Sequence, residues 1–185
     1  MWAYKDHGKS WDAIYNKEHP PGFRWLHESF GTNWRLTEMQ SAIGRIQLTR
    51  MPEWFRLRGK YADMIAVTCS AFDCIRVPTV PEYMEHANYK YYVFVKPELL
   101  ADGWDRDRIV AEINTLGVPC MQGSCSEVYL EKAFEGTGFV PSERLPVARE
   151  LGDTSLMFLV HPTLTIDEIE RMTNAISAVL DKAQK

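Results

Sequence analysis

The fold is decided by the stretch Phe30-Gly31-Thr32-Asn33-Trp34-Arg35-Leu36-Thr37-Glu38-Met39-Gln40. Thr37 followed three residues later by Gln40 is typical of a capping box, so we expect a helix to begin at this point. Asn33 and Arg35 then lie on the turn that enters the helix, where their donors can bind an anion or a carboxylate. The spacing alone favours a simpler interpretation, in which both side chains satisfy local carbonyl groups, because motifs this short recur by chance.

A long helix is predicted downstream of this turn, over residues 38–68. Apolar residues recur there at steps of three to five positions: Met39, Ile43, Ile46, Met51, Trp54, Leu57, Tyr61 and Ile65. A stripe of this kind usually faces a hydrophobic core. Pro52 lies inside the pattern and lacks a backbone donor, so we expect a kink or a break near Met51.

The segment before the turn, residues 1–36, is rich in aromatic residues and has no helical or strand periodicity. Its aromatic residues are Trp2, Tyr4, Trp11, Tyr15, Phe23, Trp25, Phe30 and Trp34. We expect an irregular segment that packs either on its own domain or against another surface, such as a large domain or a dimer interface, because aromatic residues are enriched in interface cores.

Residues 71–185 mix strand and helix signals. Strands are predicted at 75–77, 89–95 and 155–160, and Val118–Met121 reads as a short extended piece. Asp105 is expected to cap one helix, and a second capping box at Thr165 and Glu168 begins the last helix. The pattern predicts an α+β fold, with a small and mostly antiparallel sheet covered by helices.

Composition excludes several classes of protein. The 185 residues carry a formal net charge of −4, which gives no basic surface for nucleic acid. No apolar run approaches the roughly 20 residues that a membrane-spanning helix needs. The cysteines form two pairs, Cys69 with Cys74 and Cys120 with Cys125, and no histidine lies at zinc-finger spacing. We therefore expect reduced thiols and no metal site; a disulfide between Cys120 and Cys125 would need an oxidising compartment.

The motif Gly31-x-Asn33-x-Arg35-Leu36-Thr37, followed by Gln40-Ser41-Ala42-Ile43-Gly44, closely resembles a segment of the DegT/DnrJ/EryC1/StrS family. These proteins are sugar aminotransferases that depend on pyridoxal 5'-phosphate (PLP). Asp6-His7-Gly8 and the later His161-Pro162-x-Leu164-Thr165 also resemble that family. The resemblance implies the small C-terminal domain of a fold-type I PLP enzyme at 71–185, a linking helix at 37–70, and the end of the large-domain and dimer-interface region at 1–36.

The family's PLP-binding lysine lies upstream of the region that matches Asp6-His7-Gly8. The resemblance therefore implies that Lys5, Lys9 and Lys90 do not bind PLP through their amines. We expect a C-terminal part of an aminotransferase that holds no PLP stably by itself, is inactive alone, and contributes no catalytic residue.

The resemblance also implies roles for the motif residues. Asn33 would hold the PLP phosphate of a neighbouring subunit, and Arg35 would bind the acidic groups of the substrate, because a guanidinium fork fits oxyanions. The implied protein is a cytoplasmic homodimer that transfers the amino group of glutamate to a nucleotide-linked keto-sugar. Two alternatives stay open: a PLP-dependent sugar dehydratase of the same family, and a non-catalytic dimerisation or binding module.

Other candidate residues carry weaker signals. Tyr92 matches a tyrosine of a family strand motif, but Lys90 stands where the family commonly has histidine. His161 is more typical of a backbone-bonded or solvated residue than of an acid or base. His7 and His27 lie on loops that could reach a substrate, and residues 123–126 (Gly-Ser-Cys-Ser) offer donors for an anion.

Overall fold

The computed structural model describes residues 1–20 and 24–185, so Phe23, one of the aromatic residues of the first segment, lies outside the described residues. The chain divides into two compact units, Met1–Met51 and Pro52–Lys185. The boundary falls inside the long helix, between Met51 and Pro52.

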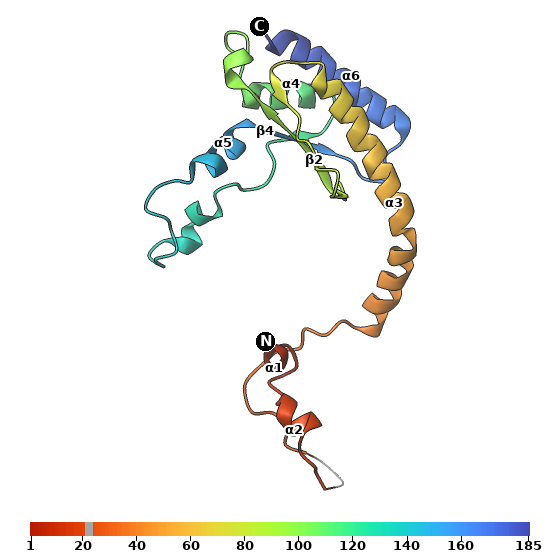
Figure 1. Cartoon of the computed structure of the whole chain (residues 1–185), viewed down its shortest axis with the longest axis vertical. Coiled ribbons are helices and arrows are strands. Elements are labelled where there is room, and N and C mark those ends of the chain that lie inside the picture. The colour runs from red at the N-terminus through yellow and green to blue at the C-terminus, as the bar shows by residue number, and fades with distance from the viewer. Residues whose placement is uncertain (21–23) are drawn as a thin grey trace. The chain divides into compact units, whose positions relative to one another are not determined.

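The second unit is built on a four-stranded sheet (Figure 1). Its strands are β1 (Ile75–Arg76), β2 (Lys90–Val95), β3 (Cys120–Met121) and β4 (Ser155–Leu159). They lie in the order β1-β2-β4-β3, and every neighbouring pair is antiparallel. The predicted α+β class and the antiparallel sheet are confirmed.

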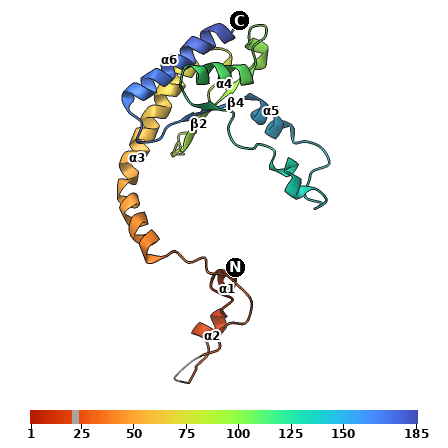
Figure 2. The ribbon, with the colours of Figure 1, turned by 180° about the vertical axis from the view of Figure 1, so that it is seen from behind.

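One face of this sheet carries the hydrophobic core. Alternate residues of the two central strands, such as Val93 of β2 and Phe158 of β4, are fully buried there. Three helices supply the other half of the core: the C-terminal part of α3 (Glu38–Ser70), α4 (Arg106–Thr115) and α6 (Ile166–Ala183). Helices α4 and α6 lie side by side in both ribbon views (Figure 2).

The chain after β3 forms a long excursion before it returns to the sheet. It contains two 3₁₀ turns, η2 (Val128–Leu130) and η3 (Lys132–Phe134), and then α5 (Pro146–Thr154), which leads directly into β4. A further 3₁₀ turn, η1 (Pro97–Leu99), follows β2. Glycine and proline residues follow these two turns, and the chain between η3 and α5 has no helix or strand.

The expected helix starts are confirmed. The Asp105 side chain accepts a hydrogen bond from the backbone of Arg108 at 2.7 Å. Thr165 and Glu168 form a complete capping box at the start of α6. At the start of α3, the Gln40 side chain accepts from Thr37 N–H at 3.0 Å and Thr37 Oγ1 accepts from Gln40 N–H at 3.3 Å.

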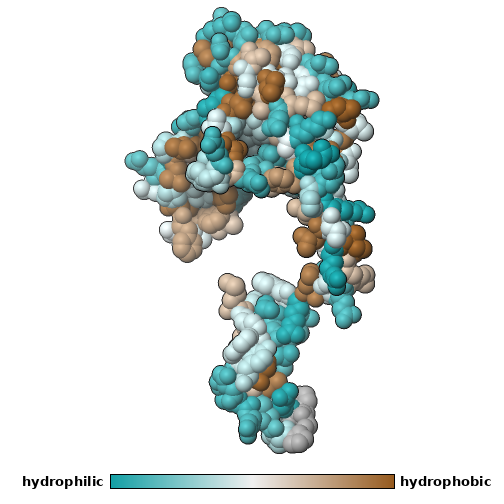
Figure 3. All heavy atoms as spheres, turned by 45° about the vertical axis from the view of Figure 1, so that its right-hand side comes forward, coloured by the Kyte–Doolittle hydropathy of each residue, from teal (hydrophilic) through white to brown (hydrophobic). Residues whose placement is uncertain are grey.

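Helix α3 runs from Glu38 to Ser70 with Pro52 inside it. The helix is therefore continuous, and the break that was one of the two expectations near Met51 does not occur. The apolar stripe of α3 is buried in the second unit and exposed in the first. Tyr61 and Ile65 are buried in the core of the second unit, whereas Met39 and Ile43 in the first unit are 75% and 54% exposed. Brown patches along this helix in Figure 3 show the exposed apolar side chains.

The first unit contains two short helices that the sequence did not predict, α1 (Trp2–Lys5) and α2 (Trp11–Tyr15). Their aromatic residues pack on one another: the ring centroids of Trp2 and Trp11 are 5.0 Å apart, and those of Tyr4 and Trp34 are 5.6 Å apart. Helices this short show no apolar period, because the contacts between rings stabilise them rather than a buried stripe.

No helix of the described residues is long and apolar enough to cross a bilayer.

Candidate functional site

Two motifs of the first unit, Asp6-His7-Gly8 and the turn at 31–35, lie against each other. Backbone hydrogen bonds join Thr32 N–H to the Tyr4 carbonyl at 2.7 Å and Trp34 N–H to the Lys5 carbonyl at 3.0 Å. Asp6 and Asn33 form an antiparallel bridge between these bonds. The pairing brings Asp6-His7-Gly8 beside the turn that carries Asn33 and Arg35.

Two glycines make this close approach possible. A Cβ atom at Gly8 would lie 1.7 Å from the Ser29 carbonyl oxygen, and one at Gly31 would lie 2.4 Å from the Gly8 nitrogen. Gly8 also has a φ of +86°, a conformation that other residues rarely adopt. Both positions therefore exclude side chains, which explains why each motif carries a glycine.

Asp6 is the centre of the charged groups in this unit. Its side chain is 1% exposed, and its Oδ2 accepts a hydrogen bond from Arg35 Nη2. His7 Nδ1 and Lys9 Nζ each lie 3.6 Å from the other oxygen, Oδ1. Burial alone would raise the pKa of Asp6, but the charges of Arg35 and Lys9 outweigh it and hold that pKa below its ordinary value.

Asn33 and Arg35, the two residues selected from the sequence, are both exposed. The Asn33 side-chain oxygen accepts a hydrogen bond from Arg35 N–H at 3.2 Å. The side-chain N–H groups of Asn33 take no part in this hydrogen bond. The Arg35 side chain is 53% exposed although it pairs with buried Asp6. The turn thus presents an amide and a guanidinium to solvent, a donor set suited to an oxyanion.

His7 lies beside Asp6, a position that the sequence did not predict. Its backbone has a φ of +59°, which is rare for a residue with a side chain and recurs at functional sites. The residue was one of two candidate histidines, and only the fold places it beside Asp6. The sequence predicted no role for Asp6, although the Asp6-His7-Gly8 motif resembles the family.

The remaining candidates lie elsewhere. His27 forms a bridge with Lys9, next to the charged cluster. In the second unit, His161 Nδ1 contacts Thr163 Oγ1 at 2.7 Å, so this ring is engaged locally as the sequence favoured. The Tyr92 hydroxyl lies 3.4 Å from Ser124 Oγ, at the start of the 123–126 loop.

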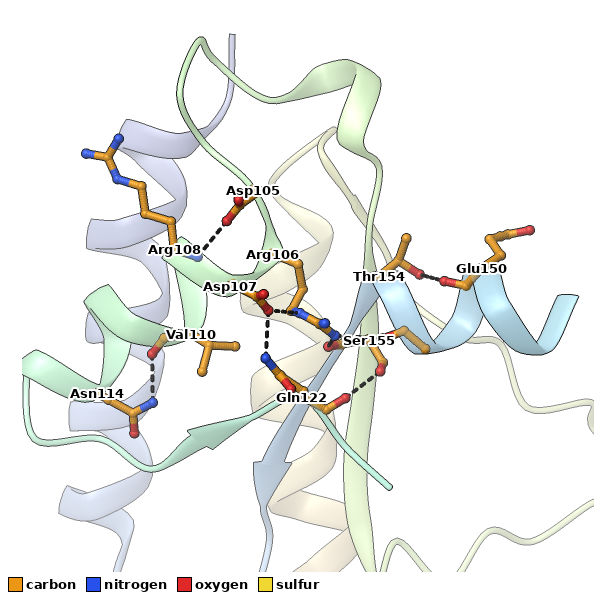
Figure 4. Close-up of polar contacts among 11 residues, drawn as sticks. Asp105, Arg106, Asp107, Arg108, Val110, Asn114, Gln122, Glu150, Thr154 and Ser155 are labelled. Atoms are coloured by element: carbon orange, nitrogen blue, oxygen red, sulfur yellow. Dashed lines mark hydrogen bonds and ion pairs between the residues drawn. The ribbon is translucent and has the colours of Figure 1, made fainter. Parts of the chain in front are cut away.

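Gln122, the residue that precedes the 123–126 loop, is held by hydrogen bonds from neighbouring elements (Figure 4). Arg106 Nη1 donates to the carbonyls of Gly152 and Ser155, at 2.8 and 3.1 Å. The Ser155 hydroxyl in turn donates to the Gln122 carbonyl at 2.5 Å, and the Gln122 amide donates to Asp107 at 2.7 Å. These contacts fix the chain that enters the loop to both α4 and β4.

An anion at this loop is disfavoured by the charge around it. The loop lines a pocket of about 440 Å³ whose walls also include the carboxylates of Glu127, Glu131 and Asp153. Glu127 and Asp153 are paired with Arg144 and Arg149. No lysine or arginine is among the described residues that line the pocket, so its lining holds no cation that would attract a phosphate or a carboxylate. The hydroxyl and thiol groups of the loop are thus better explained by local structure than by an anion site.

Glu127 joins the two ends of the 127–145 excursion through its contact with Arg144. It is 8% exposed, and it accepts hydrogen bonds from Arg144 and from the Tyr129 hydroxyl, the latter at 2.6 Å. The hydrogen bond from Arg144, followed by that from Tyr129, lowers the pKa of Glu127 to about 2. The contact joins the two ends of the excursion through one ionised carboxylate.

Acid is expected to break the contact of Glu127 with Arg144 and Tyr129. Because the pKa of Glu127 is lower in the folded chain than its ordinary value of 4.5, its stabilisation is complete above about pH 4.5 and is lost as the pH falls toward 2. The protection factors of amide hydrogen exchange in residues 127–145, which are corrected for the intrinsic slowing of exchange in acid, should therefore decrease over this range. Glu127→Gln should remove most of that pH dependence, whereas Glu131→Gln, which alters an exposed residue, should retain it. An identical profile for Glu127→Gln would contradict the assignment.

All four cysteines of the chain are free thiols in the structure. Cys69, Cys74 and Cys120 are buried free thiols, and Cys125 is an exposed one. Burial raises the pKa of Cys69 and of Cys120 to about 12, so both thiols are protonated. Among the residues that the structure describes, no cluster of histidine, cysteine or carboxylate groups could hold a metal ion.

Solved structures share this architecture. An aminotransferase from Psychrobacter cryohalolentis is 56% identical and superposes with a TM-score of 0.87, over 97% of this chain and 48% of that one. A protein from Streptococcus pneumoniae, named as a sugar aminotransferase and solved in its PLP form, has a TM-score of 0.76 at 17% identity, over 98% of this chain and 42% of that one. The second likeness concerns the fold alone.

Sequence comparison agrees. The erythromycin biosynthesis sensory transduction protein EryC1 of Saccharopolyspora erythraea is 26% identical over 155 residues, which cover 84% of this chain and 40% of the relative. The chain therefore spans less than half the length of these relatives. The profile of the DegT/DnrJ/EryC1/StrS aminotransferase family matches residues 3–177. The chain belongs to the DegT/DnrJ/EryC1/StrS aminotransferase family.

Proposed function

We propose that these residues form part of a PLP-dependent aminotransferase that transfers the amino group of glutamate to a nucleotide-linked keto-sugar. The observation that carries the proposal is the family match over residues 3–177, together with an aminotransferase that is 56% identical. The sugar substrate is supported by the name of the Streptococcus pneumoniae protein of the same fold. We place the enzyme in the cytoplasm, as a homodimer.

The chemistry of the exposed turn fits the phosphate end of PLP. Asn33 offers amide N–H groups, and Arg35 beside it offers a guanidinium that is half exposed. Among the described residues, the carboxylate that pairs with Arg35 is that of Asp6, which is buried. PLP, when bound, supplies the electron sink that amino transfer requires, and the protein supplies orientation and charge.

The two residues are assigned different tasks. Asn33 would hold the PLP phosphate of the neighbouring subunit, and Arg35 would bind the carboxylate of the amino donor or the phosphates of the sugar nucleotide. A two-fold dimer would use this turn twice, once in each site. The exposed position of the turn supports this arrangement, because a group that serves a second subunit must be accessible on its own.

The proposal is tested by assaying the complete protein that contains these residues. Purified protein is incubated with PLP, glutamate and a panel of nucleotide-linked keto-sugars, and 2-oxoglutarate and the amino sugar are measured. Formation of both products in equal amounts is expected. Loss of a sugar hydroxyl without amino transfer would favour the dehydratase, and self-association without PLP binding would favour the non-catalytic module.

Asn33→Ala is expected to weaken PLP binding by about 10- to 100-fold, because a hydrogen bond to a charged group contributes roughly 1.5–3 kcal/mol. The dissociation constant of PLP for the complete dimer, measured by absorbance titration, checks this. Asn174→Ala is the matched control, since Asn174 is an exposed asparagine on α6. Equal PLP affinity in the two variants would remove Asn33 from the phosphate site.

A further inference from the structure

We propose that Asp6 is a positioning residue that holds the guanidinium of Arg35 in the orientation in which it meets a substrate oxyanion. The proposal rests on the role given to Arg35 above and extends it to a residue outside the Gly31–Thr37 motif. Asp6 is separated from Arg35 by 29 positions in the sequence. Only the pairing of the two motifs brings them together.

Asp6 and Arg35 differ in burial. The Asp6 side chain is 1% exposed, whereas the Arg35 side chain is 53% exposed, so the pair has a fixed inner member and an accessible outer member. An exposed ion pair between two mobile side chains stabilises little. Here the carboxylate is buried, and the arginine that binds it loses rotamer freedom before any substrate arrives.

Arg35 is held at two points. Its backbone N–H donates to the Asn33 side chain at 3.2 Å, and its Nη2 donates to Asp6 Oδ2. Among the described residues, no acceptor is found for its Nε and Nη1. One part of the guanidinium is therefore engaged by the protein, and the rest stays available to a ligand. Ordering a side chain in advance increases affinity, because the entropy cost of binding falls.

Asp6 is surrounded by more positive than negative charge. Asp6 Oδ1 is buried without a hydrogen bond in the described structure, and it faces His7 Nδ1 and Lys9 Nζ, each at 3.6 Å. Lys9 thus shares the single negative charge of Asp6 with Arg35. Two permanent cations around one carboxylate leave the cluster net positive. Asp6 can therefore orient Arg35 without cancelling the attraction of Arg35 for an oxyanion.

A double-mutant cycle in the complete enzyme tests the coupling. Arg35→Ala, Asp6→Asn and the combined variant are assayed for the KM of the amino donor and of the sugar nucleotide, and for kcat. Asp6→Asn is expected to raise one of these KM values by about 5- to 10-fold with kcat changed by less than about twofold, because Arg35 binds ground and transition states alike. The combined variant should be no worse than Arg35→Ala alone, because Asp6 acts through Arg35.

Asp12→Asn is the matched control. Asp12 lies in the same unit and is exposed, and it pairs with Lys17 at 3.1 Å. It should leave both KM values unchanged. If Asp6→Asn and Arg35→Ala have additive effects, or if Asp6→Asn lowers kcat and thermal stability without changing KM, Asp6 has a merely structural role and the proposal is overturned.

A second measurement needs no variant and no activity. In the ¹⁵N-labelled chain, the Nε–H group of Arg35 is compared with that of Arg45, an exposed arginine of the same unit. A higher order parameter and slower exchange are expected for Arg35. Equal mobility of the two would overturn the positioning role. If Arg35 is ordered but Arg35→Ala leaves the kinetics unchanged, the proposed substrate role of Arg35 fails while its positioning by Asp6 stands.

Discussion

Replacing Arg35 with alanine is expected to lower kcat/KM of the complete enzyme by about 30- to 150-fold. The guanidinium that would bind an oxyanion is lost, and charge-assisted hydrogen bonds of this kind contribute roughly 2–3 kcal/mol. Folding should be affected far less, because Lys9 and His7 remain 3.6 Å from the buried Asp6 carboxylate. The measurement is steady-state kinetics with each substrate varied, beside a thermal melt.

Two further variants make this result specific. Arg35→Lys keeps the charge but loses the planar fork, so it should recover only part of the activity. Arg45→Ala removes an exposed arginine from the same unit and should leave kcat/KM unchanged. Unaltered kinetics in Arg35→Ala would exclude Arg35 from the site, and full activity in Arg35→Lys would mean that only its charge is used.

Replacing Phe158 with alanine is expected to destabilise the second unit by about 3–5 kcal/mol. Phe158 is fully buried on the central strand β4, where it is paired with Tyr91 of β2 and Cys120 of β3. Both sheet partners hold the backbone in place, so the cavity left by the ring cannot close easily. A loss of this size is a large fraction of the roughly 5–15 kcal/mol that stabilises a typical domain.

Denaturant unfolding of the chain, followed by circular dichroism, checks this expectation. Phe139→Ala is the control, because Phe139 is 77% exposed on the excursion between η3 and α5 and its removal leaves no cavity. Its midpoint should equal that of the original chain. Similar midpoints for the two variants would show that the face of the sheet that carries Phe158 is not the core.

Much of the second unit could be predicted from sequence. The strand pattern and the capping residues Asp105 and Thr165 are local signals, and they gave the correct element types within a few residues. The register of β2 against β4 could not be read in this way, because it depends on residues more than 60 positions apart, such as Val93 and Leu156.

The first unit was harder to predict. Helices α1 and α2 were missed, since ring contacts such as that between Trp2 and Trp11 leave no period in the sequence. The stripe of α3 was expected to be core, yet Met39 and Ile43 are exposed. Periodicity shows that a helix has an apolar face, but it does not show what covers that face.

The sequence by itself determined the family, the fold class and the two exposed donors, Asn33 and Arg35, because these depend on local motifs and on side-chain chemistry. Only the tertiary structure decided that Asp6 pairs with Arg35 and that His7 and Lys9 face the same carboxylate. The physical reason is that this pairing needs the backbones at Gly8 and Gly31 to approach more closely than any side chain allows. In the sequence, this approach between distant segments is indicated only by the glycine in each motif.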